Sequence, residues 1–334
     1  MGWGPRAWGR RVSELLAGFD AGQSHTRCRL APAGGGPALA EGEGPGVCHL
    51  AAPEGPQRFA AALRESLIRA RAQLVDRRDP AGTAPLRAAV VGASGIEQGT
   101  AVQQQGLAIA AACLALAPER LGVTGDERTG LRGAFPDGPG ILVISGTGTI
   151  TLGRDGGGRE HRCAGWGWLL DGAGSAMDIG RDGLALSLRM ADGREPVTPL
   201  LAALWGALGL DPADPQAPQA IKARVVDPSF GPAGFARLAP PLQEQASAGD
   251  PQAAAILMRH GEALAEAVAA VARALALEAP PVCGLGGALT HLATLQQGFR
   301  HSLARRCPGA QLVAPAGDAC DGALALARDL RPGR

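Results

Sequence analysis

Lysine and tyrosine are almost absent from this chain of 334 residues, and the scarcity of lysine excludes two classes of nucleotide-binding protein. Tyrosine does not occur, and the single lysine is Lys222. Because Lys222 is followed by alanine, the chain cannot contain the GxxxxGK[ST] loop of P-loop NTPases. The lysine context of the protein kinases is missing as well. No GxGxxG follows a predicted strand, which argues against the common dinucleotide-binding fold.

Long apolar runs, an excess of charge and paired cysteines are also missing. The longest apolar run, 107–117, falls short of the roughly 18–20 residues that a membrane span needs. The net charge is +1 and no basic run occurs, so we expect neither nucleic acid nor a membrane as a partner. Seven cysteines form no CxxC motif, and residues 1–17 do not read as a secretory signal. We therefore expect reduced thiols in a cytoplasmic protein.

Glycine, by contrast, is abundant and is concentrated in turns. It accounts for 50 of the 334 residues, about twice the usual ~7%. The stretch 141–144 reads as a strand buried on both faces, and the turn 145–149 leads into a second strand, 150–153. Glycines let a backbone approach a ligand, and consecutive amides in such a turn suit an anion. The alternative is an ordinary hairpin whose glycines supply positive φ.

A second strand–turn–strand unit lies near the start of the chain. The stretch 15–26, LLAGFDAGQSHT, contains an apolar strand, a turn and an outgoing strand. An ungapped alignment of Ser24-x-Thr26 with Thr149-x-Thr151 places Asp20 opposite Ser145. Two such units indicate a duplicated domain whose turns hold one ligand. Only the first turn carries a carboxylate, so Asp20 is the expected position for Mg²⁺; alternatively it only forms the turn.

Strands and helices alternate in the first part of the chain, which predicts an α/β fold. Strands at 86–95 and 121–126, separated by a helix at 100–117, indicate a mainly parallel sheet covered by helices. A Pro/Gly break at 136–139 divides the chain into domains 13–137 and 138–330. The second domain is predicted to be more helical, with helices at 173–190, 198–208, 217–225, 251–277, 291–306 and 318–330.

Asp126 is the candidate catalytic residue. It ends the predicted strand 121–126 and begins a helix, and open α/β sheets bind ligands at the carboxyl ends of their strands. A carboxylate there could accept the proton of an attacking hydroxyl. The alternative is a helix N-cap, and one side chain could serve both purposes.

Two glycine-rich stretches in the second half are candidate binding loops. Trp166 and Trp168 lie between glycines, where an indole could pack on a sugar or belong to the core. Asp171 and Ser175 could bind a polyol or cap the following helix. Gly286-Gly287 follows a strand and would let a purine ring lie against the backbone; the alternative is a plain left-handed turn.

Six stretches together carry a family resemblance: GFDAGQSHT, VTGDERTGLRGAF, ISGTGTITLGRDGGG, GWGWLLDGAGSAMDIGR, CGLGGALT and GDACDGALALA. In order and spacing they resemble the BadF/BadG/BcrA/BcrD-type ATPases from about Ser13 to Leu330. Within these the chain looks most like the N-acetylglucosamine and glucosamine kinases of the actin/hexokinase/Hsp70 superfamily. The resemblance implies two duplicated actin-like (ribonuclease H-like) domains with a nucleotide cleft between them. It also implies ATP- and Mg²⁺-dependent phosphorylation of a small-molecule sugar; a homodimer stays open.

The resemblance also assigns roles to individual residues. It implies a first phosphate turn (Asp20, Gly22, Gln23, Ser24), a second phosphate turn (Gly146, Thr147, Gly148, Thr149), a catalytic aspartate (Asp126), a sugar-side loop (Gly165, Trp166, Gly167, with Asp171 and Ser175) and an adenosine turn (Gly286, Gly287). Two positions depart from the family pattern. Gln23 replaces a third glycine. Asp171-Gly172-Ala173 stands where the family has Gly-Asp-Glu, which displaces the sugar-binding aspartate by one position and removes its acidic neighbour.

Two other functions fit the same scaffold. One branch of the family activates iron–sulfur enzymes through cysteines that bridge a cluster, and Cys163 and Cys283 are the candidate thiols here. The glycine-rich cysteine loop and spacing of that branch are missing. The other alternative is a sensor that binds sugar or nucleotide without turnover.

Overall fold

The computed structural model describes residues 12–76 and 80–330, so most of the expected N-terminal extension lies outside the described residues. The chain forms two compact units. The first runs to Asp137 and includes the residues from Pro315 onward, and the second is Gly138–Ala314. The division before Gly138 falls at the Pro/Gly break seen in the sequence. The sequence-based division puts the last helix in the second domain, 138–330. In the structure this helix belongs to the first unit.

The first unit is built on a five-stranded sheet with the order β3-β2-β1-β4-β5. Strand β1 pairs antiparallel with β2 and parallel with β4, and β4 pairs parallel with β5. The bounds are β1 Leu15–Ala21, β2 His25–Pro32, β3 Ala40–Pro45, β4 Leu86–Ala93 and β5 Leu121–Gly125. The strands β1, β4 and β5 therefore present their carboxyl ends at one edge of the sheet.

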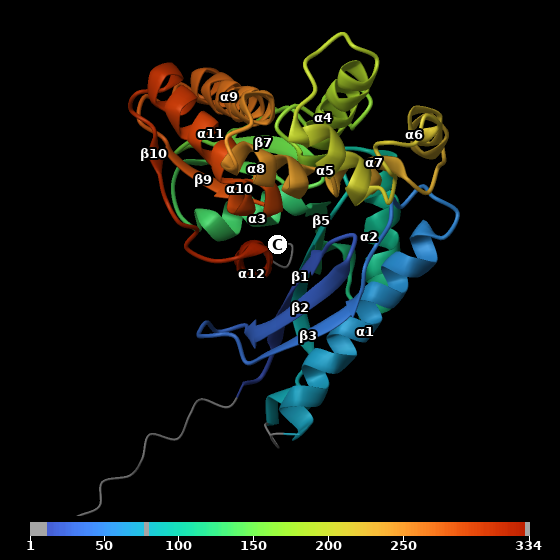
Figure 1. The fold of residues 1–334 in the computed structure, drawn as a ribbon. Coiled ribbons are helices and arrows are strands. Elements are labelled where there is room, and N and C mark those ends of the chain that lie inside the picture. Colours follow the sequence, from blue (N-terminus) through green and yellow to red (C-terminus); the bar gives the residue numbers. More distant parts are fainter. Residues whose placement is uncertain (1–11, 77–79, 331–334) are drawn as a thin grey trace, which may run out of the picture. The chain divides into compact units, whose positions relative to one another are not determined.

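Helices cover both faces of this sheet (Figure 1). They are α1 Gly55–Asp76, α2 Ala101–Leu114, α3 Asp126–Ala134 and α12 Ala319–Asp329, with short 3₁₀ turns at Pro80–Thr83 and Pro118–Arg120. Alternate residues of β1 face opposite sides. Phe19 joins the core beneath α1 and α2, whereas Leu16 packs with Leu324 of α12. Gly18 allows α12 to approach closely, since a Cβ there would lie 2.6 Å from the carbonyl oxygen of Cys320.

The second unit repeats the sheet topology of the first. Its order is β10-β9-β6-β7-β8, with β6 antiparallel to β7 and parallel to β9. The bounds are β6 Gly140–Ser145, β7 Thr149–Arg154, β8 Glu160–Cys163, β9 Pro281–Leu285 and β10 Gln311–Leu312. In each sheet, three antiparallel strands that are consecutive in the chain are extended by two parallel strands, the nearer of which pairs with the first strand of the three. The predicted α/β class and the duplication are confirmed.

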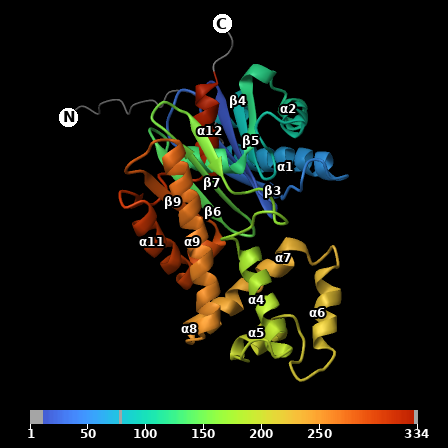
Figure 2. The same ribbon diagram turned by 90° about the horizontal axis from the view of Figure 1, so that it is seen from above.

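Helices α9 and α11 lie side by side along this second sheet, and a cluster of shorter helices extends beyond its end (Figure 2). The helices are α4 Ala176–Ala191, α5 Pro199–Ala207, α6 Ala217–Val225, α7 Gly231–Ala236, α8 Ala239–Ser247, α9 Pro251–Ala274, α10 Gly287–His291 and α11 Ala293–Arg306. One continuous apolar core joins the sheet residue Val143 to Leu257 of α9 and Leu242 of α8. The helical cluster therefore belongs to the same folded unit as the sheet.

All seven cysteines are free thiols, four of them buried, as the sequence predicts. In the described ranges, no helix combines the length and apolarity that crossing a bilayer demands.

Candidate active site

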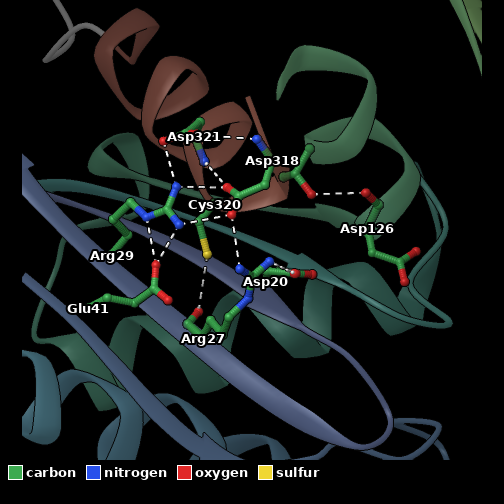
Figure 3. Close-up of polar contacts among 9 residues, drawn as sticks. Asp20, Arg27, Arg29, Glu41, Asp126, Asp318, Cys320 and Asp321 are labelled. Atoms are coloured by element: carbon green, nitrogen blue, oxygen red, sulfur yellow. Dashed lines mark hydrogen bonds and ion pairs between the residues drawn. The ribbon is translucent and has the colours of Figure 1, made fainter. Parts of the chain in front are cut away.

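Asp20 and Asp126 lie at the carboxyl edge of the first sheet. Asp20 is the penultimate residue of β1, opposite Gly92 of β4, and Asp126 directly follows β5 as the first residue of α3. The N-cap of α3 is Gly125, so Asp126 does not cap this helix. The capping alternative is thereby removed for Asp126. Its carboxyl group is left at the sheet edge, where Figure 3 shows it with Asp20.

Burial, as the largest cause, and then the nearby carboxylates of Glu127 and Asp20 raise the pKa of Asp126 to about 7, against backbone hydrogen bonds that lower it. Removing a carboxylate from water disfavours its charged form, and like charges act in the same direction. A side chain with this pKa can take up a proton near neutral pH, which suits a general base.

Asp20 is held by an arginine on the neighbouring strand. Arg27 Nη2 lies 2.8 Å from Asp20 Oδ2, and the two side chains are 25% and 24% exposed. Within ranges 12–76 and 80–330, Asp20 Oδ1 has no hydrogen-bond partner, and no group of three His, Cys, Asp or Glu side chains could enclose a metal. Mg²⁺ commonly binds through one or two carboxylates together with substrate phosphates and water. Asp20 fits that mode and does not form a complete protein cage.

The first turn leaves its polar side chains available. Gly22 donates its amide to His25 O at 3.1 Å and accepts from the Val47 amide at 2.9 Å, which fixes the turn backbone. The side chains of Gln23 and Ser24 are exposed. The turn is therefore rigid in its backbone and open in its side chains.

The second turn uses two of its three hydroxyls for its own structure. Ser145 is buried and donates to Gly174 O at 2.6 Å, and Thr149 Oγ1 donates to Ile144 O at 3.1 Å. Only Thr147 is exposed. The sequence-based expectation of three hydroxyls around a ligand is thus reduced to one, because the other two hold the turn in shape.

The glycines of the predicted adenosine turn and of the second turn differ in what the fold requires of them. Gly286 has φ +96°, and a Cβ there would collide with the carbonyl group of Ser145, so the fold needs glycine at this position. Gly146 and Gly148 have no positive φ, and a Cβ at either would meet nothing within 4 Å. Packing among the described residues gives no reason for these two glycines. A ligand against the backbone would give one.

A pocket of about 510 Å³ adjoins the second turn. Gly146, Thr147 and Gly287 line it, so the structure brings the second turn and the predicted adenosine turn together within one unit. Most of the remaining wall is apolar, with Arg237 and His291 as the charged or titratable side chains. Such pockets, apolar with a few polar groups, are typical of small-molecule sites. Gly286 itself has φ +96° and ψ 152°, a conformation that favours glycine but differs from the left-handed turn of the alternative interpretation.

Both tryptophans of the predicted sugar-side loop are exposed, which excludes a core role for them. Trp166 is 62% and Trp168 is 42% exposed, and the Arg162 guanidinium lies 4.9 Å from the centre of the Trp166 ring. Arg162 also donates to Gly165 O, which ties this loop to the end of β8. Gly165 and Gly167 have φ of +77° and +93°, values that favour glycine.

The structure separates the roles of Asp171 and Ser175. Ser175 is fully buried, and its hydroxyl accepts the Asp178 amide at 3.1 Å as the N-cap of α4. This geometry is the capping alternative, not a polyol contact. Asp171 is half-buried and stays available.

Asp178 is a buried acid that the sequence analysis missed. Its carboxyl group lies beneath the backbone of Gly172, where a Cβ would be 2.9 Å from Asp178 Cγ. Burial raises its pKa, against the lowering effects of Arg181 and His260. Its place seven residues after Asp171 in the same glycine-rich stretch was the available signal.

A charged network around Asp20 was also missed (Figure 3). Arg27 and Arg29, two residues apart on β2, both reach Asp318 at the N-terminus of α12, at 2.9 and 2.8 Å. Arg29 also contacts Glu41 and Asp321. The alternation of the two arginines places them on one face of β2. Their partners follow only from the three-dimensional packing of α12.

Two curated proteins that resemble this chain are both named as kinases of N-acetylated amino sugars. It is 28% identical over 208 residues to the N-acetylmuramic acid/N-acetylglucosamine kinase of Clostridium acetobutylicum, covering 62% of this chain and 66% of that protein. It is 30% identical over 191 residues to the N-acetyl-D-glucosamine kinase of Dictyostelium discoideum, covering 56% of this chain and 59% of that protein. The match thus spans less than two thirds of the length of both curated relatives.

Similarity to a solved structure extends over nearly the whole chain. A proposed N-acetylglucosamine kinase of Chromobacterium violaceum superposes with a TM-score of 0.70 at 32% identity, covering 95% of this chain and 99% of that one. The profile of the BadF/BadG/BcrA/BcrD ATPase family matches residues 18–327. The chain belongs to the BadF/BadG/BcrA/BcrD ATPase family.

Proposed function

We propose that this protein transfers the γ-phosphoryl group of ATP to a hydroxyl of an amino sugar of the N-acetylglucosamine or glucosamine class. The observation that carries the proposal is the Asp126 carboxyl group, placed at the carboxyl edge of the first sheet with a pKa of about 7. The kinase names of the relatives support the same reaction.

Nucleotide binding is assigned to the two turns and the pocket beside the second one. Gly146 and Thr147 would offer backbone amides and a hydroxyl to the phosphates, and Gly287 would border the adenosine. Arg237 lines the same pocket, and its side chain has no ion-pair or hydrogen-bond partner within the described ranges, so its charge is available to an anion. Asp20 would hold Mg²⁺, which, when bound, neutralises charge on the phosphates.

Transfer of the phosphoryl group requires a proton acceptor for the sugar hydroxyl. Asp126 would orient the hydroxyl and accept its proton while the sugar oxygen bonds to the γ-phosphorus and the bond to the ADP oxygen breaks. Trp166 and Asp171 would contact the sugar, the first through its exposed indole face and the second through its carboxylate. Positioning and electrostatics are the main contributions of the protein in such reactions.

The test is a coupled ADP-release assay with glucosamine, N-acetylglucosamine, N-acetylmuramic acid and glucose as acceptors. We expect an amino sugar to give the highest kcat/KM. Asp126→Asn should lower kcat by about 100-fold or more, since general-base catalysis contributes roughly 10²–10⁴-fold, while ATP affinity changes little. Asp137→Asn, an exposed aspartate in the same unit, is the matched control and should behave as wild type.

Two outcomes would assign the protein to the other functions. ATP or sugar binding without turnover of any acceptor would indicate a sensor. An iron-dependent chromophore would indicate an iron–sulfur activator. The buried Cys283 argues against the latter, because burial raises its thiol pKa to about 11 and withdraws it from a bridging position.

A further inference from the structure

Arg27 is placed between two carboxylates, one at the proposed phosphate site and one on the last helix. Its Nη2 contacts Asp20 Oδ2 at 2.8 Å, and its Nη1 contacts Asp318 Oδ2 at 2.9 Å (Figure 3). The planar guanidinium therefore uses one nitrogen for each acid. A lysine could not do this with comparable geometry, because its ammonium is a point charge on a flexible stem.

Asp318 is itself held in place, so Arg27 is fixed from behind. The Asp318 side chain accepts the Asp321 amide at 3.0 Å, and the Asp321 side chain accepts the Asp318 amide at 3.2 Å, a reciprocal capping box at the start of α12. Helix α12 in turn packs on the sheet through Leu324 and Ala327. The position of Arg27 is thus set by the packing of a complete helix.

We propose that Arg27 is a positioning residue for Asp20, an inference that rests on the proposed kinase function. By binding Oδ2, Arg27 fixes the orientation of the Asp20 carboxylate and leaves Oδ1 for Mg²⁺ or for water bound to it. The positive charge of Arg27 also offsets part of the negative charge of the Asp20 carboxylate. Removing a residue that hydrogen-bonds a metal ligand commonly changes metal affinity or activity by about 10–100-fold.

Arg29 provides a matched control on the same strand. It contacts Asp318, Asp321 and Glu41 and is as much a part of the ion-pair network as Arg27. It is also of similar burial, with 16% exposure against 25% for Arg27. Among the described residues Arg29 forms no hydrogen bond or ion pair with Asp20, so its loss would disturb the network and leave the contact between Arg27 and Asp20 in place.

The experiment compares Arg27→Gln, Arg27→Lys and Arg29→Gln in the full-length protein. Measurements are the Mg²⁺ dependence of kcat, the Mg²⁺-ATP and metal-free ATP affinities by calorimetry, and the unfolding midpoint. We expect Arg27→Gln to lower kcat at least about tenfold and to change the Mg²⁺ concentration for half-maximal activity. We expect Arg29→Gln to lower the unfolding midpoint as much while keeping both kinetic values near wild type, and Arg27→Lys to fall between them.

Asp20→Asn and the Asp20→Asn/Arg27→Gln double variant complete a cycle. If Arg27 acts through Asp20, its substitution should have little further effect on Mg²⁺-ATP affinity in the Asp20→Asn background. Equal effects of the Arg27 and Arg29 variants, or wild-type Mg²⁺ dependence in Arg27→Gln, would overturn the positioning role. Failure of the wild-type protein to bind Mg²⁺-ATP would instead overturn the proposed function itself.

Discussion

At the scale of single residues, the site depends on carboxyl groups whose neighbours set their properties. Asp126 is kept partly protonated near neutral pH by burial and by the charges of Glu127 and Asp20, whereas Asp20 is paired with Arg27. Two acids of the same type at one sheet edge are thereby suited to different tasks. One can exchange a proton near neutral pH, and the other is paired with a guanidinium group.

The raised pKa of Asp126 predicts a pH-dependent stability effect of Asp126→Asn. The folded-state pKa of about 7 lies above the ordinary value of 3.8, so the wild-type fold loses stability as the pH rises between these values. Asparagine stays neutral and avoids that loss. The variant should therefore be more stable than wild type by on the order of 2 kcal/mol at about pH 8 and equal to it at about pH 4.

Urea unfolding at the two pH values measures this effect without any substrate. The control is Asp137→Asn, the same substitution at an exposed aspartate of the first unit. A variant that is less stable than wild type at the higher pH would show that Asp126 is not desolvated.

At the scale of elements, a glycine substitution in the predicted adenosine turn and one in the second turn should have opposite consequences. Gly286→Ala should lower stability by about 1–3 kcal/mol, because its φ is positive and its Cβ would collide with Ser145. Gly146→Ala should leave stability within about 0.5 kcal/mol of wild type and weaken ATP binding, because its Cβ would occupy space beside the pocket.

Chemical denaturation and ATP titration of both variants separate the two effects. A Gly34→Ala variant, whose Cβ also meets nothing within 4 Å, serves as the control for a harmless substitution. Unchanged ATP affinity in Gly146→Ala would remove the second turn from the nucleotide site.

The elements that the sequence predicted are those with a strong local signal. The helix at 217–225 has the predicted bounds, and the long helix predicted at 251–277 is observed at Pro251–Ala274. Strand β8 was missed because Glu160–Cys163 is short and lacks apolar alternation. Helices α7 and α8 were missed because glycine and proline at their starts read as turns, although proline is well tolerated in a first helical turn.

The candidate site divides in the same way. The sequence indicated both turns and Asp126 as candidates because glycine, hydroxyl and carboxyl residues follow apolar strands there. The ungapped alignment of the two hairpins did not predict how the strands of each hairpin pair. Asp20 pairs with Arg27, whereas Ser145 pairs with Thr149, so the first connection is longer. The Arg27–Asp318 contact joins residues 291 positions apart and has no local signal.

At the scale of the whole molecule, the discontinuous first unit predicts how fragments behave. Residues 138–314 form a contiguous unit with its own apolar core, so this fragment should fold alone. A fragment ending at 137 lacks α12, leaving Leu16 and Val90 uncovered and Arg27 without Asp318. It should expose apolar surface and aggregate, as measured by dye binding and light scattering.

Adding the missing helix tests the cause of that behaviour. A synthetic peptide spanning 315–330 should restore solubility to the 1–137 fragment, and a peptide with Leu324→Asp should not. A 1–137 fragment that unfolds cooperatively without the peptide would contradict the requirement for α12.

The late position of α12 in the chain also affects synthesis on the ribosome. The five strands of the first sheet are all made before residue 126, yet the helix that covers one face of that sheet begins at residue 319. At elongation rates of roughly 5–20 residues per second, that face waits about ten to forty seconds for its cover. The sheet that is synthesised first is therefore covered last, and nascent chains should depend on chaperones during that interval.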